Sequence, residues 1–99
     1  MFDSVAENLL QNGLMGSLYA ERVLGISKPR VGIVSNGEEA DKGSMLVRDT
    51  YKLLKESSLN FIGNLEGKDI TKGTADVIVT DGFTGNVIVK HTEGIVSFL

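Results

Sequence analysis

Residues 76–86 run Asp76-Val77-Ile78-Val79-Thr80-Asp81-Gly82-Phe83-Thr84-Gly85-Asn86. Three consecutive β-branched apolar residues without polar alternation are typical of a parallel strand that is covered on both faces. The loop that follows contains two glycines, and glycine permits close approach of a backbone to a ligand. The stretch therefore predicts a buried strand ending in a loop suited to binding, which places the chain in the α/β class.

A helix is predicted at the start of the chain. Apolar residues recur at helical spacing over residues 4–24, and Gly25 supplies a stop just beyond them. Interior glycines cost roughly 1 kcal/mol each relative to alanine, so we expect a break near Asn12-Gly13 as an alternative to a continuous helix.

A strand, a second helix and another extended run follow in the middle of the chain. Pro29 excludes helix and favours an extended Lys28, after which residues 30–34 are apolar enough for a short buried strand. Ser44 is placed to cap a helix that continues to about residue 56. Residues 60–63 form the next extended run.

The last segment, residues 87–99, allows two interpretations. Val87-Ile88-Val89 favours strand by local propensity. An element that follows a buried parallel strand should cross over the sheet, however, and Thr84 is a suitable N-cap, so a helix is predicted. Three short strands leave both edges of such a sheet open, so we expect the chain to be a fragment of a larger, mostly parallel α/β sheet protein.

The composition excludes several classes of function. Ninety-nine residues with 41% hydrophobic content suffice for one domain or part of one. The chain has no cysteine and one histidine, so neither a disulfide framework nor a metal site is expected. Ten basic residues against thirteen acidic ones, without a basic stripe, argue against nucleic acid as a partner. With no apolar run long enough for a bilayer and no signal peptide pattern, we expect a cytoplasmic protein.

The candidate binding residues lie in three glycine-containing loops. Each loop follows a predicted strand, and ligands of parallel sheets gather at the carboxyl ends of the strands. Residues 81–86 would offer the N–H groups of a helix N-terminus to an anion, or Asp81 and Thr84 simply cap backbone. Lys42 and Ser44 are placed to meet a phosphate, or belong to a solvated acidic loop. Residues 64–69 form a charged clamp or an ordinary exposed turn.

Two further features lie outside this candidate site. His91 is better explained as a surface or packing residue than as an acid or base. A glycine pattern of the Walker or Rossmann type is absent, so nucleotide hydrolysis is not supported.

Four stretches resemble the bacterial phosphate acyltransferase family of phospholipid synthesis, in the same order along the chain. They are Leu14-Met15-Gly16-Ser17-Leu18-Tyr19-Ala20-Glu21, Pro29-Arg30-Val31-Gly32, residues 60–70 and residues 75–87. The resemblance implies a three-layer, mostly parallel sheet similar to that of phosphotransacetylase and the isocitrate and isopropylmalate dehydrogenases. Residues 1–99 would then be the central part of a single domain whose N- and C-terminal portions lie outside this chain.

The resemblance also implies a reaction and its partners. The family transfers a fatty acyl group from acyl-acyl-carrier protein to inorganic phosphate, giving acyl phosphate for phospholipid synthesis, and no cofactor is needed. A homodimer and peripheral contact with the inner face of the membrane are implied in the same way. Two alternatives stay open: a non-catalytic remnant of such an enzyme, and acetyl transfer between coenzyme A and phosphate as in phosphotransacetylases.

The residue roles follow from this reaction. Thr84, Gly85 and Asn86 are assigned to contact phosphate or the oxyanion, and Asp81 to orient their loop. The substrate- and phosphate-binding assignments comprise the counter-charges Lys42 and Lys68 together with Ser44, Asn36 and Glu66.

Overall fold

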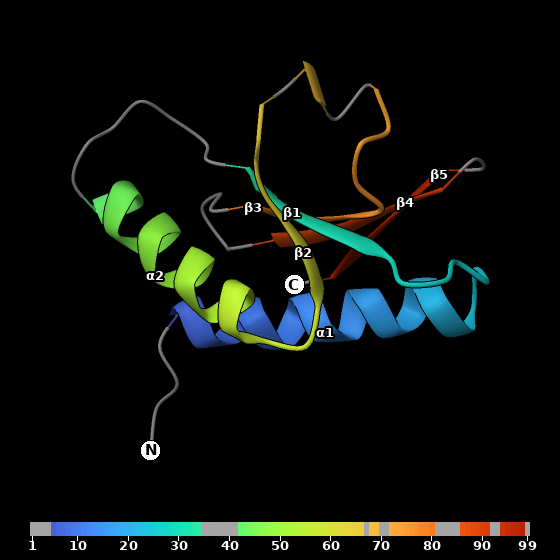
Figure 1. The fold of residues 1–99 in the computed structure, drawn as a ribbon, viewed down its shortest axis with the longest axis horizontal. Coiled ribbons are helices and arrows are strands. Elements are labelled where there is room, and N and C mark those ends of the chain that lie inside the picture. Colours follow the sequence, from blue (N-terminus) through green and yellow to red (C-terminus); the bar gives the residue numbers. More distant parts are fainter. Residues whose placement is uncertain are drawn as a thin grey trace.

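The computed structural model describes residues 5–34, 42–66, 68–69, 72–80, 86–91 and 94–98; residues 42–44, 86, 91 and 94–98 are described by their backbone alone. The elements follow one another as α1 (Val5–Arg22), β1 (Arg30–Val34), α2 (Lys42–Glu56), β2 (Asn60–Leu65), β3 (Val77–Thr80), β4 (Asn86–His91) and β5 (Gly94–Phe98). Figure 1 shows both helices lying on one side of the sheet. The chain is thus α/β, as predicted.

The strands form one sheet in the order β2-β1-β3-β4-β5. β1 pairs in parallel with both β2 and β3, whereas β4 pairs antiparallel with β3 and with β5. All strands except β4 therefore run in the same direction. The predicted mostly parallel sheet is confirmed, and the arrangement agrees with the fold type that the resemblance implies.

The core lies between the helices and one face of the sheet. Alternate residues of the three central strands point to this face, where they meet Leu9 and Ala20 of α1 and Leu54 of α2. The strand residues of this cluster are Val31, Ile33, Val77, Val79, Val87 and Val89.

α1 is continuous through both of its glycines. Its buried positions recur every three or four residues: Ala6, Leu9, Gly13, Gly16 and Ala20. The break considered near Asn12-Gly13 does not occur, because the glycines lie on the buried face, where α1 packs against β3 and β4. The helix ends as predicted near Gly25, whose φ of +74° favours glycine, and the Ile26 N–H donates to the Ala20 carbonyl (3.0 Å).

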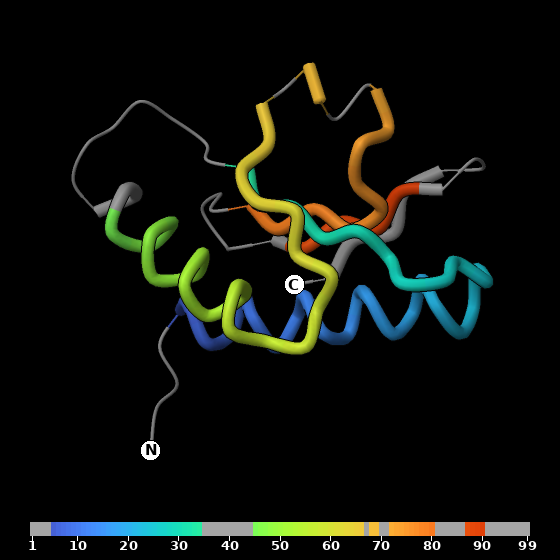
Figure 2. The backbone as a smooth tube through the Cα atoms, viewed as in Figure 1, coloured from blue at the N-terminus to red at the C-terminus, as the bar shows by residue number. Residues whose placement is uncertain are grey.

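The second face of the sheet is covered by a loop. Leu65, Ala75 and Ile78 form a small cluster there, with Val34 and Ile88 packed against it. Figure 2 shows the chain between β2 and β3 rising on the side of the sheet opposite the helices. The helix layer and the loop therefore cover opposite faces of the same strands.

The predicted C-terminal helix is wrong. Residues 86–91 and 94–98 are the antiparallel strands β4 and β5, and His91 is the last residue of β4. A crossover is needed only when the next strand of the sheet is parallel, and β4 instead turns back beside β3. With that requirement removed, the β-branched run 87–89 follows its local propensity, burying Val87 and Val89 against α1.

Two local predictions also need correction. α2 begins at Lys42, so Ser44 lies in its first turn and is not the N-cap. Lys28 is not extended: its φ is +51°, in the left-handed region. The side-chain amide of Asn60 donates to the Lys28 carbonyl (3.1 Å), a contact from the start of β2 that stabilises this turn before β1.

Candidate functional site

The carboxyl ends of the parallel strands form one edge of the sheet, which we call the rim. Val34 pairs with Leu65 on one side and with Thr80 on the other, and Thr80 pairs with Asn86 at the start of β4. These four residues therefore lie in a single row across four strands. Figure 1 shows the ends of β1 and β3 on the same side of the molecule as the start of α2. The prediction that the loops after β1, β2 and β3 share one edge is confirmed at the level of these strand ends.

The candidate residues are described to different extents. Asn36, Asp81, Thr84 and Gly85 lie outside the described residues. The backbone places Lys42 and Ser44 in the first turn of α2 and Asn86 at the first position of β4. The side chains of Glu66 and Lys68 are described and follow β2 directly past the rim. The segments that the strand pairing brings together at the rim are the ends of β1, β2 and β3 and the start of β4.

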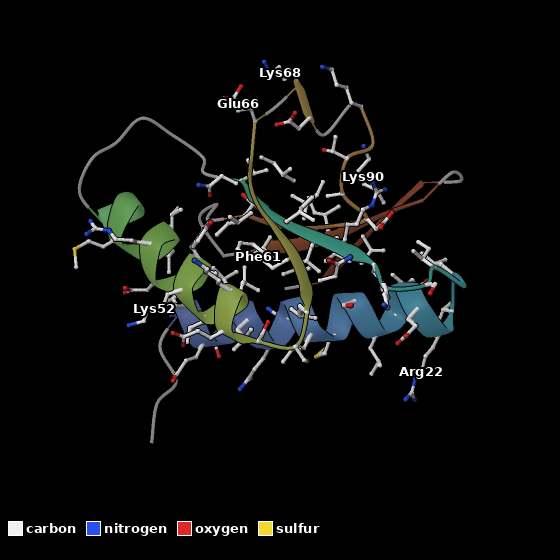
Figure 3. The ribbon with its side chains drawn as sticks, viewed as in Figure 1. Arg22, Lys52, Phe61, Glu66, Lys68 and Lys90 are labelled. Atoms are coloured by element: carbon white, nitrogen blue, oxygen red, sulfur yellow. The ribbon has the colours of Figure 1, made fainter. Side chains whose placement is uncertain are left out.

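Glu66 and Lys68 form a weak ion pair. Lys68 Nζ lies 3.8 Å from Glu66 Oε1, and the side chains are 69% and 77% exposed, respectively. Exposed pairs of this kind contribute about 0–1 kcal/mol. Figure 3 shows both residues at the tip of the loop between β2 and β3. Because the pair is weak and solvated, the ammonium of Lys68 can exchange its carboxylate partner for another anion at little cost.

Asp69 fixes the turn that carries this pair, a role that the sequence interpretation missed. The Glu66 N–H donates to Asp69 Oδ2 (2.8 Å), and the Asp69 N–H donates back to the Glu66 carbonyl (2.9 Å). The Asp69 carbonyl accepts from the Thr74 hydroxyl (2.8 Å). The available signal was an aspartate three residues after the turn begins, since aspartate often bonds backbone N–H groups locally.

The correction at the C-terminus changes the chemistry expected after β3. Residues 81–85 connect β3 to a strand, so Asn86 does not stand at a helix N-terminus. The dipole argument for an anion at residues 84–86 is therefore removed. α2, the next element after β1, begins at Lys42 and keeps a helix N-terminus, and Lys42 and Ser44 lie in its first turn.

A second polar cluster lies at the opposite edge of the sheet, where β1 and β3 begin. The Arg30 backbone N–H and Nε donate to Asp76 Oδ2 (2.9 and 3.1 Å), and Nη2 donates to Asp76 Oδ1 (3.2 Å) and to the Gly73 carbonyl (3.0 Å). Burial alone would raise the pKa of Asp76, but the hydrogen bonds and charge of Arg30 outweigh it and lower that pKa below its usual value. The cluster joins two strands far from the rim and is structural.

An open groove of about 410 Å³ is also found away from the rim. It runs between α1 and the turns that precede β1 and β2, lined by Leu14, Leu18, Pro29 and Leu59 among others. Pro29 and Asn60 lie at the amino ends of their strands, so the groove is not part of the candidate site.

Comparisons with known proteins identify the family. The model of the fatty acid synthesis protein family matches residues 2–99. The chain belongs to this family. The resemblance drawn from the sequence is thereby confirmed, and relatives that are similar to the chain carry a name that states an acyltransferase activity.

Three relatives illustrate the similarity. Proteins named phosphate acyltransferase from Bacillus licheniformis, Lactobacillus delbrueckii subsp. bulgaricus and Heliobacterium modesticaldum are 53%, 56% and 58% identical to the chain. The alignments cover 93%, 92% and 93% of the chain, respectively, but 28% of each relative. The chain therefore spans little more than a quarter of the length of these relatives. Neither helix of the described residues is long and apolar enough to cross a membrane.

Proposed function

We propose that the whole protein transfers a fatty acyl group from acyl-acyl-carrier protein to inorganic phosphate. The family match and the name phosphate acyltransferase of its relatives support an acyl transfer in lipid synthesis that involves phosphate. Acyl-carrier protein as the donor extends this proposal through the resemblance. A homodimer in the cytoplasm, with peripheral contact to the inner face of the membrane, is proposed on the same ground.

The reaction is phosphorolysis of a thioester. A phosphate oxygen attacks the acyl carbonyl carbon to give a tetrahedral oxyanion, and the C–S bond then breaks. The carrier's thiol leaves with the proton that the phosphate gives up, and acyl phosphate is the other product. No covalent enzyme intermediate is needed, so catalysis requires positioning of a dianion beside the carbonyl and hydrogen-bond donors for the oxyanion.

The observation that best supports a site at the rim is the row formed by Leu65, Val34, Thr80 and Asn86. Three loops leave the sheet next to this row, so groups from each can act on one substrate. In the proposal, Thr84, Gly85 and Asn86 contact phosphate or the oxyanion, and Asp81 orients their loop. Because Asn86 is the first residue of a strand, the proposal assigns these contacts no help from a helix dipole.

The remaining groups attract the phosphate. Lys42 and Ser44, in the first turn of α2, combine a positive charge and a hydroxyl with the N-terminal end of a helix dipole. Lys68 is proposed as the second counter-charge, since its 3.8 Å pair with Glu66 is weak enough for a dianion to replace. Asn36 is proposed as a further contact, and Glu66 as the group that holds Lys68 until phosphate arrives.

The test is a kinetic comparison made on the full-length protein. Asn86→Ala should lower phosphate-dependent thiol release from acyl-acyl-carrier protein by roughly 10²-fold or more if Asn86 contacts the oxyanion. Asn8→Ala, an exposed asparagine of α1, is the matched control and should retain wild-type rates. Wild-type turnover by Asn86→Ala would refute the assignment. A wild-type protein that used acetyl-coenzyme A exclusively would refute the choice of donor and favour a phosphotransacetylase reaction.

A further inference from the structure

The outer surface of α2 separates its charges into two halves. Arg48, Lys52 and Lys55 are exposed and fall at positions i, i+4 and i+7. At about 100° of rotation per residue, these cations lie within roughly 60° of one another, and the exposed acids Asp49 and Glu56 lie together on the other side of Lys52. Figure 3 shows Lys52 projecting from α2 away from the sheet. We call Arg48, Lys52 and Lys55 the basic stripe. It was not predicted from the sequence, because these cations alternate with Asp49 and Glu56 along the chain and come together only on the surface of the helix.

The basic stripe stands out against the charge of the whole chain. α2 carries four basic and two acidic residues, although the chain as a whole has ten basic and thirteen acidic residues. The other elements and loops therefore hold six basic against eleven acidic residues. A positive surface on an acidic chain attracts a negatively charged partner and repels the same positive surface of a second copy.

The described structure does not use the basic stripe internally. The ion pairs found among the described residues involve Arg30 with Asp76 and Lys68 with Glu66, and no member of the stripe takes part in them. An apolar contact is also available on the same surface, because Met45 lies seven residues before Lys52 and is 60% exposed. A flexible methionine beside cations suits a surface that binds another protein.

The basic stripe lies on α2, the helix that follows β1 in the chain. Along α2, at 1.5 Å per residue, Arg48 lies about 9 Å and Lys55 about 20 Å from Lys42. A partner bound there sits on the helix that follows β1 in the chain, since α2 begins at Lys42 and β1 ends at Val34. A substrate carried on a long flexible arm could then reach the rim while its carrier stays on α2.

We propose that the basic stripe, together with Met45, docks the acidic face of an acyl-carrier protein. This inference rests on the proposed function, which requires a protein-bound thioester as acyl donor. Charge complementarity favours an acidic protein over nucleic acid, because the stripe is short, has no aromatic residues among its cations and belongs to an acidic chain. The stripe contributes to binding of the carrier and takes no part in the chemical step.

The test uses the full-length protein with Lys52→Glu and Lys55→Glu combined. Arg22→Glu combined with Lys28→Glu is the matched control, because it makes the same change of charge at exposed positions of another surface. Two quantities are measured: equilibrium binding of acyl-acyl-carrier protein at low and moderate salt, and thiol release from that substrate and from an acyl-pantetheine thioester of the same chain length. Far-UV circular dichroism verifies that both variants keep their helix content.

The stripe variant should bind acyl-acyl-carrier protein about tenfold more weakly, raise its KM to a similar extent and lose most of the salt dependence of binding. Turnover of the acyl-pantetheine thioester should stay at the wild-type value, and the control should resemble wild type in every assay.

Unchanged carrier binding, or an equal loss with both substrates, would overturn the docking surface. Loss of binding to vesicles of anionic phospholipid with carrier binding intact would assign the stripe to a lipid surface instead. If wild type released no thiol from acyl-acyl-carrier protein, the proposed reaction would fail, while the binding comparison would still decide the docking surface.

Discussion

Gly13 and Gly16 lie on the same buried face of α1, but a methyl group added at each position meets different surroundings. A Cβ atom at residue 13 would lie 3.5 Å from Val79 Cγ2 and at least 3.8 Å from the two leucine methyl groups nearby, which is ordinary van der Waals contact. Alanine is favoured over glycine inside a helix by about 1 kcal/mol, and burying one methyl group adds about 0.8 kcal/mol. Gly13→Ala should therefore raise the free energy of unfolding by about 1–2 kcal/mol.

The same change at residue 16 is expected to lack this gain in stability. Its Cβ atom would lie 3.1 Å from Val87 Cγ1 and 3.3 Å from methyl groups of Val77 and Val89. Valine has one stiff side-chain torsion, and all three valines are fully buried, so none can swing aside. Overpacking of this kind costs about 1–3 kcal/mol, which offsets the gain in helix propensity. Gly16→Ala should be less stable than Gly13→Ala by about 1–3 kcal/mol.

Urea unfolding followed by far-UV circular dichroism measures this difference as a shift of midpoint at constant slope. A double-mutant cycle then tests the cause: Val87→Ala should cost less in the Gly16→Ala background than in wild type, because it makes room for the new methyl group. The packing argument fails if Gly16→Ala is as stable as Gly13→Ala, or if Val87→Ala costs the same in both backgrounds.

Three other changes have definite expected outcomes. Gly32→Ala should lower stability by about 1–3 kcal/mol because its Cβ would lie 2.6 Å from Leu65 Cγ, and Leu65→Ala should relieve part of that loss in urea unfolding. Thr50→Val should be neutral or stabilising by up to about 1 kcal/mol, since Thr50 Oγ1 is fully buried and has no hydrogen-bond partner among the described residues; a clear loss of stability in urea unfolding would show that it has one. The pKa of Asp76 is lowered in the folded state, so its contribution is complete above the unfolded pKa of about 4 and disappears as pH falls through the folded value. When the free energy of unfolding is measured against pH, Asp76→Asn should therefore lose less stability than wild type as the pH falls. Identical slopes for the two proteins would contradict the contribution of Arg30.

The elements that could be predicted from sequence are those in which one local pattern decides the outcome. The apolar run of β1 and the apolar and charged faces of α2 have no competing interpretation. The bounds of β1, Arg30–Val34, were predicted to the residue. The segment 87–99 differs because local propensity and chain topology conflict there. The topological rule assumed another parallel neighbour for β3, and no feature of the local sequence states that β4 pairs antiparallel with it.

The features of the candidate site were also predictable only in part. That β1, β2 and β3 end at one edge follows from parallel pairing alone, so the row of Leu65, Val34 and Thr80 was predictable. The Glu66–Asp69 contacts that fix the turn after β2 are local, and the three-residue spacing was a signal for them that the sequence interpretation did not use.

Because β4 pairs antiparallel with β3, the helix N-terminus that is proposed to attract the phosphate also changes. A helix after β3 would have brought its positive dipole end to residues 84–86, whereas the first turn of α2 now provides the described helix N-terminus that follows a rim strand. A phosphate dianion held by Lys42 and the start of α2 would approach from the β1 side, leaving Asn86, across β3 from Val34, to meet the acyl oxygen. Attack requires the phosphate to meet the carbonyl carbon while the oxyanion donors meet the oxygen. In the proposal these contacts come from α2, which follows β1, and from Asn86 of β4, and β3 lies between β1 and β4 in the sheet.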